Sequence, residues 1–297
     1  MITVSVPGKI HLMGEHAVVY GKPALLAAIN LRLKVSVEKA KKLDIVSNEP
    51  TEYVRHAVEC VTQECRLQHL PKIRITIVSD IPAGYHLGSS AAVAVSTVGA
   101  LLYFLKKMWD TTVVNRIAYE IEKQKHGNPS GGDNTAVTFG GLLWFRKECE
   151  FLKNMIQIPF SVPKTLNHFY LIDTGRPIET TGEMVAYVKT RRNLQKFLND
   201  NEMQTKRIVT AFKEGDEKLL IDSVQTGERT LEDVGVVSNK AISMIRVIEK
   251  TGGAAKILGG GGKKDGVGYL LCYSHNPPHG AIPIELGGEG VRLEKKV

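Results

Sequence analysis

The sequence predicts an α+β fold built from two domains. Strand-like and helix-like segments are mixed along the chain without repeating as βαβ units, which argues against a doubly wound parallel sheet. The length of 297 residues suffices for two ordinary domains or one large one. Around residues 156–166 the pattern lapses into a proline-containing connection. We therefore expect the domains to span residues 1–160 and 161–297.

The first half of the chain supplies strands and apolar helices. Residues 72–79 alternate strictly between apolar and polar, which is typical of a half-buried strand. Residues 80–88 form a turn, and an apolar helix follows from Ser89 to about Leu105. The remaining predicted elements are strands at Thr3–Val6, Pro23–Ile29, Arg32–Lys39 and Gly140–Phe145, and helices at Thr51–Glu64 and Thr112–Lys125.

The second half is predicted to be mainly helical between two groups of strands. Several helices lie between Thr181 and Lys250. The predicted strands are Phe169–Ile172, Ala254–Leu258, Val267–Cys272 and a last one at Gly290–Leu293.

Composition narrows the class of protein. Lys and Arg exceed Asp and Glu by 39 to 31, a net charge of +8 that favours anionic partners such as nucleic acid, a membrane surface or phosphorylated small molecules. The short basic runs lack the aromatic residues of nucleic-acid modules, so we expect no nucleic-acid partner. The N-terminus does not resemble a signal peptide, no apolar run suggests a membrane span, and the four cysteines form no CxxC pair. A cytoplasmic protein without membrane contact is expected.

One segment has the chemistry of a phosphate cradle. Residues 81–92 join a strand to the apolar helix, and Gly84 and Gly88 allow the backbone to approach a ligand closely. Ser89 and Ser90 can cap the helix, whose free N–H groups would bind an anion. The alternative is an ordinary serine-capped helix. Neither a Walker A sequence nor a G-x-G-x-x-G sequence is present.

Three further clusters are candidates for chemistry. The run Gly259–Gly262, with Lys263 and Lys264 beside it, is either a close approach to an anion or a flexible hairpin. The segment His126–Asn134 is predicted to be a rigid turn that presents Asp133, as a general base, a metal ligand or only a cap, with Glu122 upstream on the preceding helix.

The third of these clusters lies at the N-terminus. Lys9 follows a Pro-Gly bend on a mostly buried segment, where it needs a partner unless it reaches the surface. Glu15 and His16 form either a surface pair or part of a pocket. By contrast, His275 and His279 have no third ligand nearby, so no zinc site is expected there.

The order of these clusters is more specific than any one of them. Pro-Gly-Lys with Gly-Glu-His-Ala-Val-Val-Tyr-Gly, then Leu-Gly-Ser-Ser-Ala-Ala, then Gly-Asn-Pro-Ser-Gly-Gly-Asp-Asn and a late glycine run resemble the GHMP kinase superfamily, and most closely its mevalonate kinases. The resemblance implies an N-terminal domain like ribosomal protein S5 domain 2, a ferredoxin-like C-terminal domain, and ATP and substrate in the cleft between them. It also implies transfer of the γ-phosphoryl group of ATP to the 5-hydroxyl group of mevalonate, in isoprenoid precursor synthesis.

The resemblance also implies roles for individual residues. Asp133 would accept or orient the proton of the acceptor hydroxyl, and Lys9 would pair with Asp133. Ser90 and Glu122 would hold Mg²⁺. The residues expected to wrap ATP are Gly84, Leu87, Gly88, Ser89, Ser90 and Ala91, and those expected near the acceptor are Glu15, His16 and Thr180. A homodimer is a candidate assembly.

The sequence departs from the family at two places. Tyr85 and His86 stand where small residues are usual, so they would crowd the phosphates or stack on the nucleotide. In the late motif, Leu258 replaces a threonine, Gly260 an alanine, and Lys263-Lys264 the last glycines. The alternatives are a phosphomevalonate or sugar kinase of the same superfamily and, more remotely, a non-catalytic nucleotide- or nucleic-acid-binding protein. Retention of Lys9, Ser90, Glu122 and Asp133 argues against the last.

Overall fold

The strands form two sheets in the computed structural model, which describes residues 1–47, 51–126 and 129–294. The first sheet has the order β11-β1-β2-β4-β3, with β5 paired to β2 and β6 to β5; the second has the order β10-β7-β9-β8. The strands of the first sheet are β1 (Ile2–Met13), β2 (Ala24–Lys39), β3 (Asp44–Val46), β4 (Ile73–Ser79), β5 (Leu142–Lys147), β6 (Lys153–Gln157) and β11 (Arg292–Leu293). Those of the second are β7 (Phe169–Asp173), β8 (Ala254–Ile257), β9 (Tyr269–Tyr273) and β10 (Ile282–Ile284).

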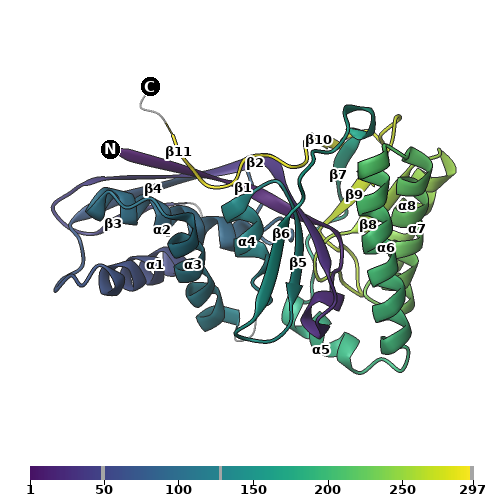
Figure 1. Cartoon of the computed structure of the whole chain (residues 1–297), viewed down its shortest axis with the longest axis horizontal. Coiled ribbons are helices and arrows are strands. Elements are labelled where there is room, and N and C mark those ends of the chain that lie inside the picture. Colours follow the sequence, from purple (N-terminus) through teal and green to yellow (C-terminus); the bar gives the residue numbers. More distant parts are fainter. Residues whose placement is uncertain (48–50, 127–128, 295–297) are drawn as a thin grey trace.

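Strands β1 and β2 connect the two halves of the molecule. In Figure 1 these purple strands run from the N-terminal end towards the green helices of the C-terminal half. Nearly all of β1 is buried, because helices from both halves pack on it. Close packing at its far end depends on Gly227, where an added Cβ atom would lie 2.1 Å from Met13 Cε.

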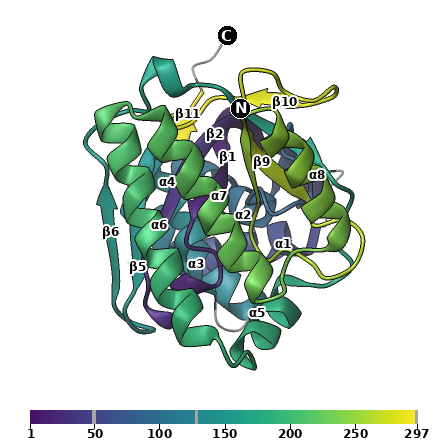
Figure 2. The ribbon, with the colours of Figure 1, turned by 90° about the vertical axis from the view of Figure 1, so that its right-hand side faces the viewer.

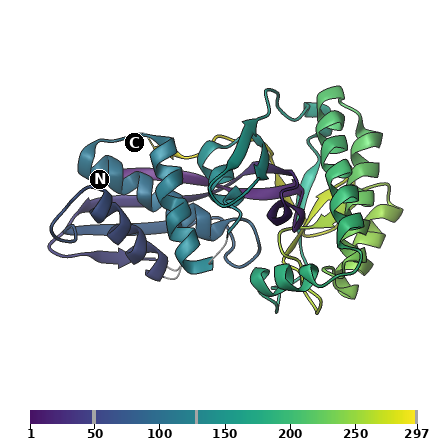
Figure 3. The ribbon, with the colours of Figure 1, turned by 60° about the horizontal axis from the view of Figure 1, so that its bottom comes forward.

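Four helices of the first half, α1 (Thr51–Glu64), α2 (Ser89–Lys106), α3 (Thr111–His126) and α4 (Gly132–Phe139), pack together beside the first sheet (Figure 3). The central one, α2, contacts β1, β2 and both α1 and α3. It is the one helix among the described residues that is long and apolar enough to cross a membrane, but 72% of it is buried. The prediction of a buried core helix is therefore confirmed.

The helices of the second half cover the second sheet. They are α5 (Thr181–Lys189), α6 (Leu194–Glu214), α7 (Glu217–Asp233) and α8 (Asn239–Lys250), and two short 3-10 turns lie at Ala17–Tyr20 and Lys164–Leu166. Figure 2 shows α6, α7 and α8 side by side in front of the strands. Asp216 and Ser238 begin α7 and α8 by accepting hydrogen bonds from backbone N–H groups, as N-cap residues do.

The C-terminal segment returns to the first sheet. Val291 N–H donates to the carbonyl of Thr138 at 3.0 Å, and β11 pairs with β1 through Val4 and Leu293. Residues 292–293 therefore pair with a strand of the first half, although they belong to the predicted second domain. The division at residues 160 and 161 stays a prediction.

Several predicted elements need correction. Residues 24–39 form one strand rather than two, because β2 pairs with β1 on both sides of Asn30. Strands β3, β6 and β10 were not predicted: two have only three residues, and β6 is an exposed edge strand without alternation. The expected serine cap of α2 is wrong, since its N-cap is Gly88. Within the predicted turn at 126–134, residues 127 and 128 lie outside the described part, and helix α4 begins at Gly132.

Replacing Gly140 with alanine is expected to destabilise the return of the C-terminal segment. A Cβ atom there would lie 2.2 Å from Gly290 N, and φ is +69°. Gly280→Ala is the matched control, because φ is +82° but nothing lies within 4 Å. The control should cost about 1 kcal/mol of unfolding free energy from backbone strain. Gly140→Ala should cost about 1–3 kcal/mol more, from overpacking and from a ψ of −166° that glycine alone adopts readily. Equal losses in urea unfolding would contradict this packing.

Candidate active site

The ammonium group of Lys9 is the centre of the candidate site. Lys9 lies on β1 directly after an irregularity in the pairing with β2 at Pro7 and Gly8, and its side chain is 2% exposed. Its Nζ lies 3.0 Å from Asp133 Oδ1 and 3.3 Å from His11 Nδ1. The alternative of a lysine that reaches the surface is therefore wrong. The side chain passes beside Gly88, where a Cβ atom would lie 2.8 Å from Lys9 Cγ.

Asp133 differs from Lys9 in being accessible. It lies in the first turn of α4, after Gly131, which takes the N-cap position with φ of +84°. Its side chain is 38% exposed. A carboxylate in the first turn of a helix is favoured by the helix dipole. Asp133 is thus not the cap of α4, and it is held by a buried cation while part of the carboxylate faces outward.

The phosphate-cradle segment presents backbone N–H groups beside this pair. Gly84, His86 and Gly88 all have positive φ, so the loop winds tightly before α2. Lys9 N–H donates to the carbonyl of Leu87 at 2.9 Å, which ties the loop to β1. In the first turn of α2, the N–H groups of Ser89, Ser90 and Ala91 have no partner within the helix. Such a helix start binds anions well.

Tyr85 and His86 both contact residues of the second half of the chain. The Tyr85 ring lies 5.0 Å from that of Tyr269, centroid to centroid. His86 is packed so closely against Gly259 that a Cβ atom there would lie 2.6 Å from His86 Cβ. The expectation that these side chains crowd the phosphates or stack on a nucleotide stays a prediction; within the protein, Tyr85 contacts β9 and His86 contacts the glycine run.

Glu15 and His16 are both buried, which excludes a surface pair. Glu15 forms an ion pair with Lys256 of β8. His16 Nε2 donates to the carbonyl of Gly260 at 3.1 Å. Burial raises the pKa of Glu15 and lowers the pKa of His16 to about 4. Burial and the nearby Lys9 lower the pKa of His86 to about 4. The same two causes hold the pKa of His11 well below its usual range. These three histidines are neutral at pH 7.

Ser90 and Glu122 meet at a residue that the sequence did not single out. The Tyr53 hydroxyl donates to Glu122 Oε1 at 3.2 Å, and the Ser90 side chain is also a hydrogen-bonding partner of that hydroxyl. Burial and the Glu122 carboxylate raise the pKa of Tyr53 well above its ordinary value. A carboxylate and a hydroxyl converging beside the cradle are the oxygen donors that suit Mg²⁺. No motif marks Tyr53, which is one apolar-face residue of α1.

Thr180 is not joined to this group by any contact of its side chain among the described residues. It is exposed and begins α5 in a capping box, in which its hydroxyl bonds to Glu183 Oε2 at 2.9 Å. The next residue, Thr181, contacts the glycine run at Gly260, where a Cβ atom would lie 3.1 Å from Thr181 Cα. Thr180 therefore lies at the edge of the candidate site.

The glycine run is packed rather than flexible. A Cβ atom at Gly261 would lie 2.1 Å from the carbonyl oxygen of Val236, so a larger residue does not fit. The ammonium group of Lys263 lies 4.5 Å from the centroid of the Tyr187 ring, a cation–π contact.

An unpredicted arginine lies over the loop. A Cβ atom at Gly84 would be 3.0 Å from Nε and from a terminal nitrogen of Arg176. Arg176 is exposed, and its guanidinium makes no hydrogen bond or ion pair with any residue in the described ranges.

Comparisons with known proteins agree with this geometry. Residues 52–141 match the family described as the GHMP kinases N terminal domain. The mevalonate kinase of Archaeoglobus fulgidus is 34% identical over 298 residues, covering 98% of this chain and 99% of that protein. The mevalonate kinase of Pyrococcus abyssi is 30% identical over 345 residues, covering 99% and 98%.

Solved structures share the fold. The Methanococcus jannaschii mevalonate kinase matches with a TM-score of 0.77 at 20% identity, covering 98% of this chain and 96% of that one. A Streptococcus pneumoniae phosphomevalonate kinase in complex with phosphomevalonate and AMPPNP matches with a TM-score of 0.75 at 20% identity, covering 93% of each chain. The predicted α+β GHMP kinase fold is confirmed.

The neutral histidines predict a pH dependence of stability, and His86, which is partly buried, provides the test. Because the folded pKa of His86 is about 4 and the unfolded value is near 6.5, the unfolded state binds more protons between these values. Stability is therefore full above pH 6.5 and falls as pH drops towards 4, by up to about 3 kcal/mol for this one group.

Urea unfolding between pH 4.5 and 7.5 measures this contribution. His86→Asn should flatten the pH dependence, and asparagine tolerates the positive φ at this position. His279→Asn, at an exposed position, is the control and should leave the wild-type slope unchanged. Identical slopes for wild type and His86→Asn would show that His86 is not held neutral by burial.

Proposed function

The chain belongs to the mevalonate kinase family within the GHMP kinase superfamily, and from this premise we propose that it transfers the γ-phosphoryl group of ATP to the 5-hydroxyl group of mevalonate. The observation that carries the proposal is the 3.0 Å contact between buried Lys9 and accessible Asp133, next to a tightly wound loop that leads into α2. The similarity to mevalonate kinases, 34% and 30% identity over nearly the full length, supports the choice of acceptor.

Asp133 and Lys9 are the proposed catalytic residues. The exposed part of the Asp133 carboxylate would accept a hydrogen bond from the acceptor hydroxyl and orient that oxygen for attack on the γ-phosphorus. Lys9 would stabilise negative charge that develops on the attacking oxygen. Phosphoryl transfer depends mainly on such positioning and charge stabilisation. The buried position of Lys9, 2% exposed, strengthens its electrostatic effect.

ATP is proposed to bind at the start of α2. The backbone of Gly84, Leu87, Gly88, Ser89, Ser90 and Ala91 would surround the phosphates, since tight turning and free N–H groups occur there together. Ser90 and Glu122 would hold Mg²⁺, with Tyr53 keeping both side chains in place. When bound, the ion would neutralise charge on the phosphate oxygens. The unpaired guanidinium of Arg176 over Gly84 adds positive charge.

The acceptor is proposed to lie towards Glu15, His16 and Thr180. Glu15 forms an ion pair with Lys256, so its proposed role is to hold the neighbouring backbone in place rather than to bind the acceptor. His16 Nδ1 is buried and has no hydrogen-bond partner among the described residues. Because Nε2 carries the proton, Nδ1 could accept a hydrogen bond from a hydroxyl group of the substrate. Thr180 would contribute from the edge of the site.

A phosphomevalonate kinase or a sugar kinase is the second candidate. The net charge of +8 and the unpaired Arg176 suit a phosphorylated acceptor. A non-catalytic nucleotide- or nucleic-acid-binding protein has no need for the Lys9–Asp133 pair.

We further propose a role in isoprenoid precursor synthesis, a cytoplasmic location without membrane or nucleic-acid partners, and a homodimer as the assembly to test.

The acceptor is tested by ADP release with Mg-ATP and, in turn, mevalonate, phosphomevalonate, galactose and homoserine. We expect mevalonate to have the highest kcat/KM, by about 100-fold or more, because a site built to bind particular polar groups rejects acceptors that leave them unpaired. The Asp133→Asn variant, purified in the same way, controls for contaminating kinases. Preference for phosphomevalonate would overturn the acceptor, and no turnover with any of the four would overturn the kinase activity.

A further inference from the structure

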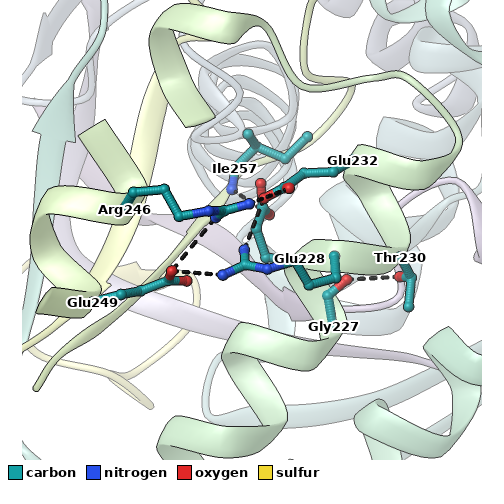
Figure 4. Close-up of polar contacts among 8 residues, drawn as sticks. Gly227, Glu228, Thr230, Glu232, Arg246, Glu249 and Ile257 are labelled. Atoms are coloured by element: carbon teal, nitrogen blue, oxygen red, sulfur yellow. Dashed lines mark hydrogen bonds and ion pairs between the residues drawn. The ribbon is translucent and has the colours of Figure 1, made fainter. Parts of the chain in front are cut away.

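Glu228 is a buried carboxyl group that the proposed reaction does not use. It lies on α7 with no exposed surface, and its Oε2 accepts a hydrogen bond of 3.0 Å from Ile257 N–H (Figure 4). Its Oε1 is buried and has no hydrogen-bond partner among the described residues. Ile257 ends β8 immediately before Leu258 and the glycine run. Glu228 thus holds the backbone where the glycine run begins.

A buried lysine holds the same residue, Ile257, through its carbonyl group. Lys256 Nζ donates to the carbonyl of Ile257 at 2.6 Å and to that of His11 at 3.3 Å, and it forms the ion pair with Glu15. Glu15, Lys256 and Glu228 are all 2% exposed or less. Two carboxyl groups therefore share the surroundings of one ammonium group.

These charges balance if Glu228 is the neutral member. Glu15 contacts the ammonium group directly, whereas no hydrogen bond or ion pair joins Glu228 to Lys256 in the described chain. Burial raises the pKa of Glu228 well above its ordinary value. A neutral carboxyl group still accepts the hydrogen bond from Ile257 N–H.

The turn of α7 that carries Glu228 is fixed on two sides. Figure 4 shows a ring of ion pairs between α7 and α8 beside it. Arg229 contacts Glu232 at 2.8 Å and Glu249 at 2.5 Å, and Arg246 contacts the same two carboxylates at 2.5 and 3.5 Å. On the other side, Gly227 packs against Met13 of β1. The Glu228 carboxyl group therefore has a defined position.

The glycine run, which follows Ile257, contacts two residues of the candidate site. Gly260 accepts the hydrogen bond from His16, and Gly259 packs against His86 of the phosphate loop. A shift of Ile257 would disturb both contacts, because Ile257 lies just before this segment and its side chain packs on Gly261, where a Cβ atom would lie 2.6 Å from Ile257 Cδ1.

We propose that Glu228 is a positioning residue for phosphoryl transfer, whose carboxyl group fixes Ile257 and thereby sets the glycine run against His16 and the phosphate loop. This inference rests on the proposed kinase function. It concerns Glu228 alone, which lies outside the proposed ATP and acceptor sites and whose hydrogen bond is to the backbone of Ile257.

The test compares Glu228→Ala and Glu228→Gln with Ser223→Ala in the full chain. Ser223 is buried on the same helix, but its hydroxyl donates only to Leu219 within that helix, so Ser223→Ala is the matched control. Glu228→Ala should lower kcat/KM for Mg-ATP by about 10- to 100-fold, as small misplacements of a reacting group do. Glu228→Gln should stay within about 3-fold of wild type, since its amide oxygen can still accept from Ile257 N–H.

Amide hydrogen exchange of residues 257–262 provides a readout that needs no turnover. Exchange should speed up in Glu228→Ala and remain near wild type in Glu228→Gln and Ser223→Ala. If wild type turns over none of the four acceptors, the proposed function fails, while the exchange result still decides whether Glu228 positions the glycine run.

Two results would overturn the inference. The first is a folded Glu228→Ala with wild-type kinetics and exchange. The second is a Glu228→Gln as impaired as Glu228→Ala, because Glu228 would then act through its charge. If Glu228→Ala does not fold, Glu228→Asp replaces it: the side chain is one methylene shorter, and wild-type kinetics and exchange in that variant would equally contradict the inference.

Discussion

The structure depends on one constraint: the ammonium group of Lys9 is buried and must be paired. Removing a charge from water costs several kcal/mol or so unless a partner and hydrogen bonds compensate. Asp133 supplies the partner at 3.0 Å, and a neutral His11 adds a further contact. Gly88 leaves space for the lysine side chain, which places the start of α2 beside the pair. The cradle and the proposed catalytic pair are therefore parts of one packing arrangement.

Contacts between the two halves of the chain extend this arrangement. The Glu15–Lys256 ion pair joins the loop after β1 to β8. His16 and His86 both contact the glycine run. These polar groups are buried, so each one needs its partner in place. The glycines are required because neighbouring backbone and rings occupy the space of a Cβ atom. The site is thus formed by segments that are more than 200 residues apart in sequence.

Local patterns predicted much of the fold, and contacts between distant segments explain what they missed. Helix α1 matches its predicted bounds, and α2 and β4 match within a residue, because their periodicity or alternation reflects burial. Motif order identified Lys9 and Asp133, which lie together. Tyr53, Arg176 and Glu228 carry no local signal, since their positions follow from packing across elements. The contacts of Tyr85 and His86 within the protein were not predicted, because their partners, Tyr269 and Gly259, lie far along the chain in the second half.

A double-mutant cycle on kcat tests the central claim that Lys9 and Asp133 act as one unit. Lys9→Met and Asp133→Asn should each lower kcat by about 10²–10⁴-fold, with the fold intact by circular dichroism. If the pair acts as a unit, the double variant should be no worse than the more impaired single variant, since effects of coupled groups do not add. A double variant whose loss equals the product of the two single losses would show that the two residues act independently and would contradict the account.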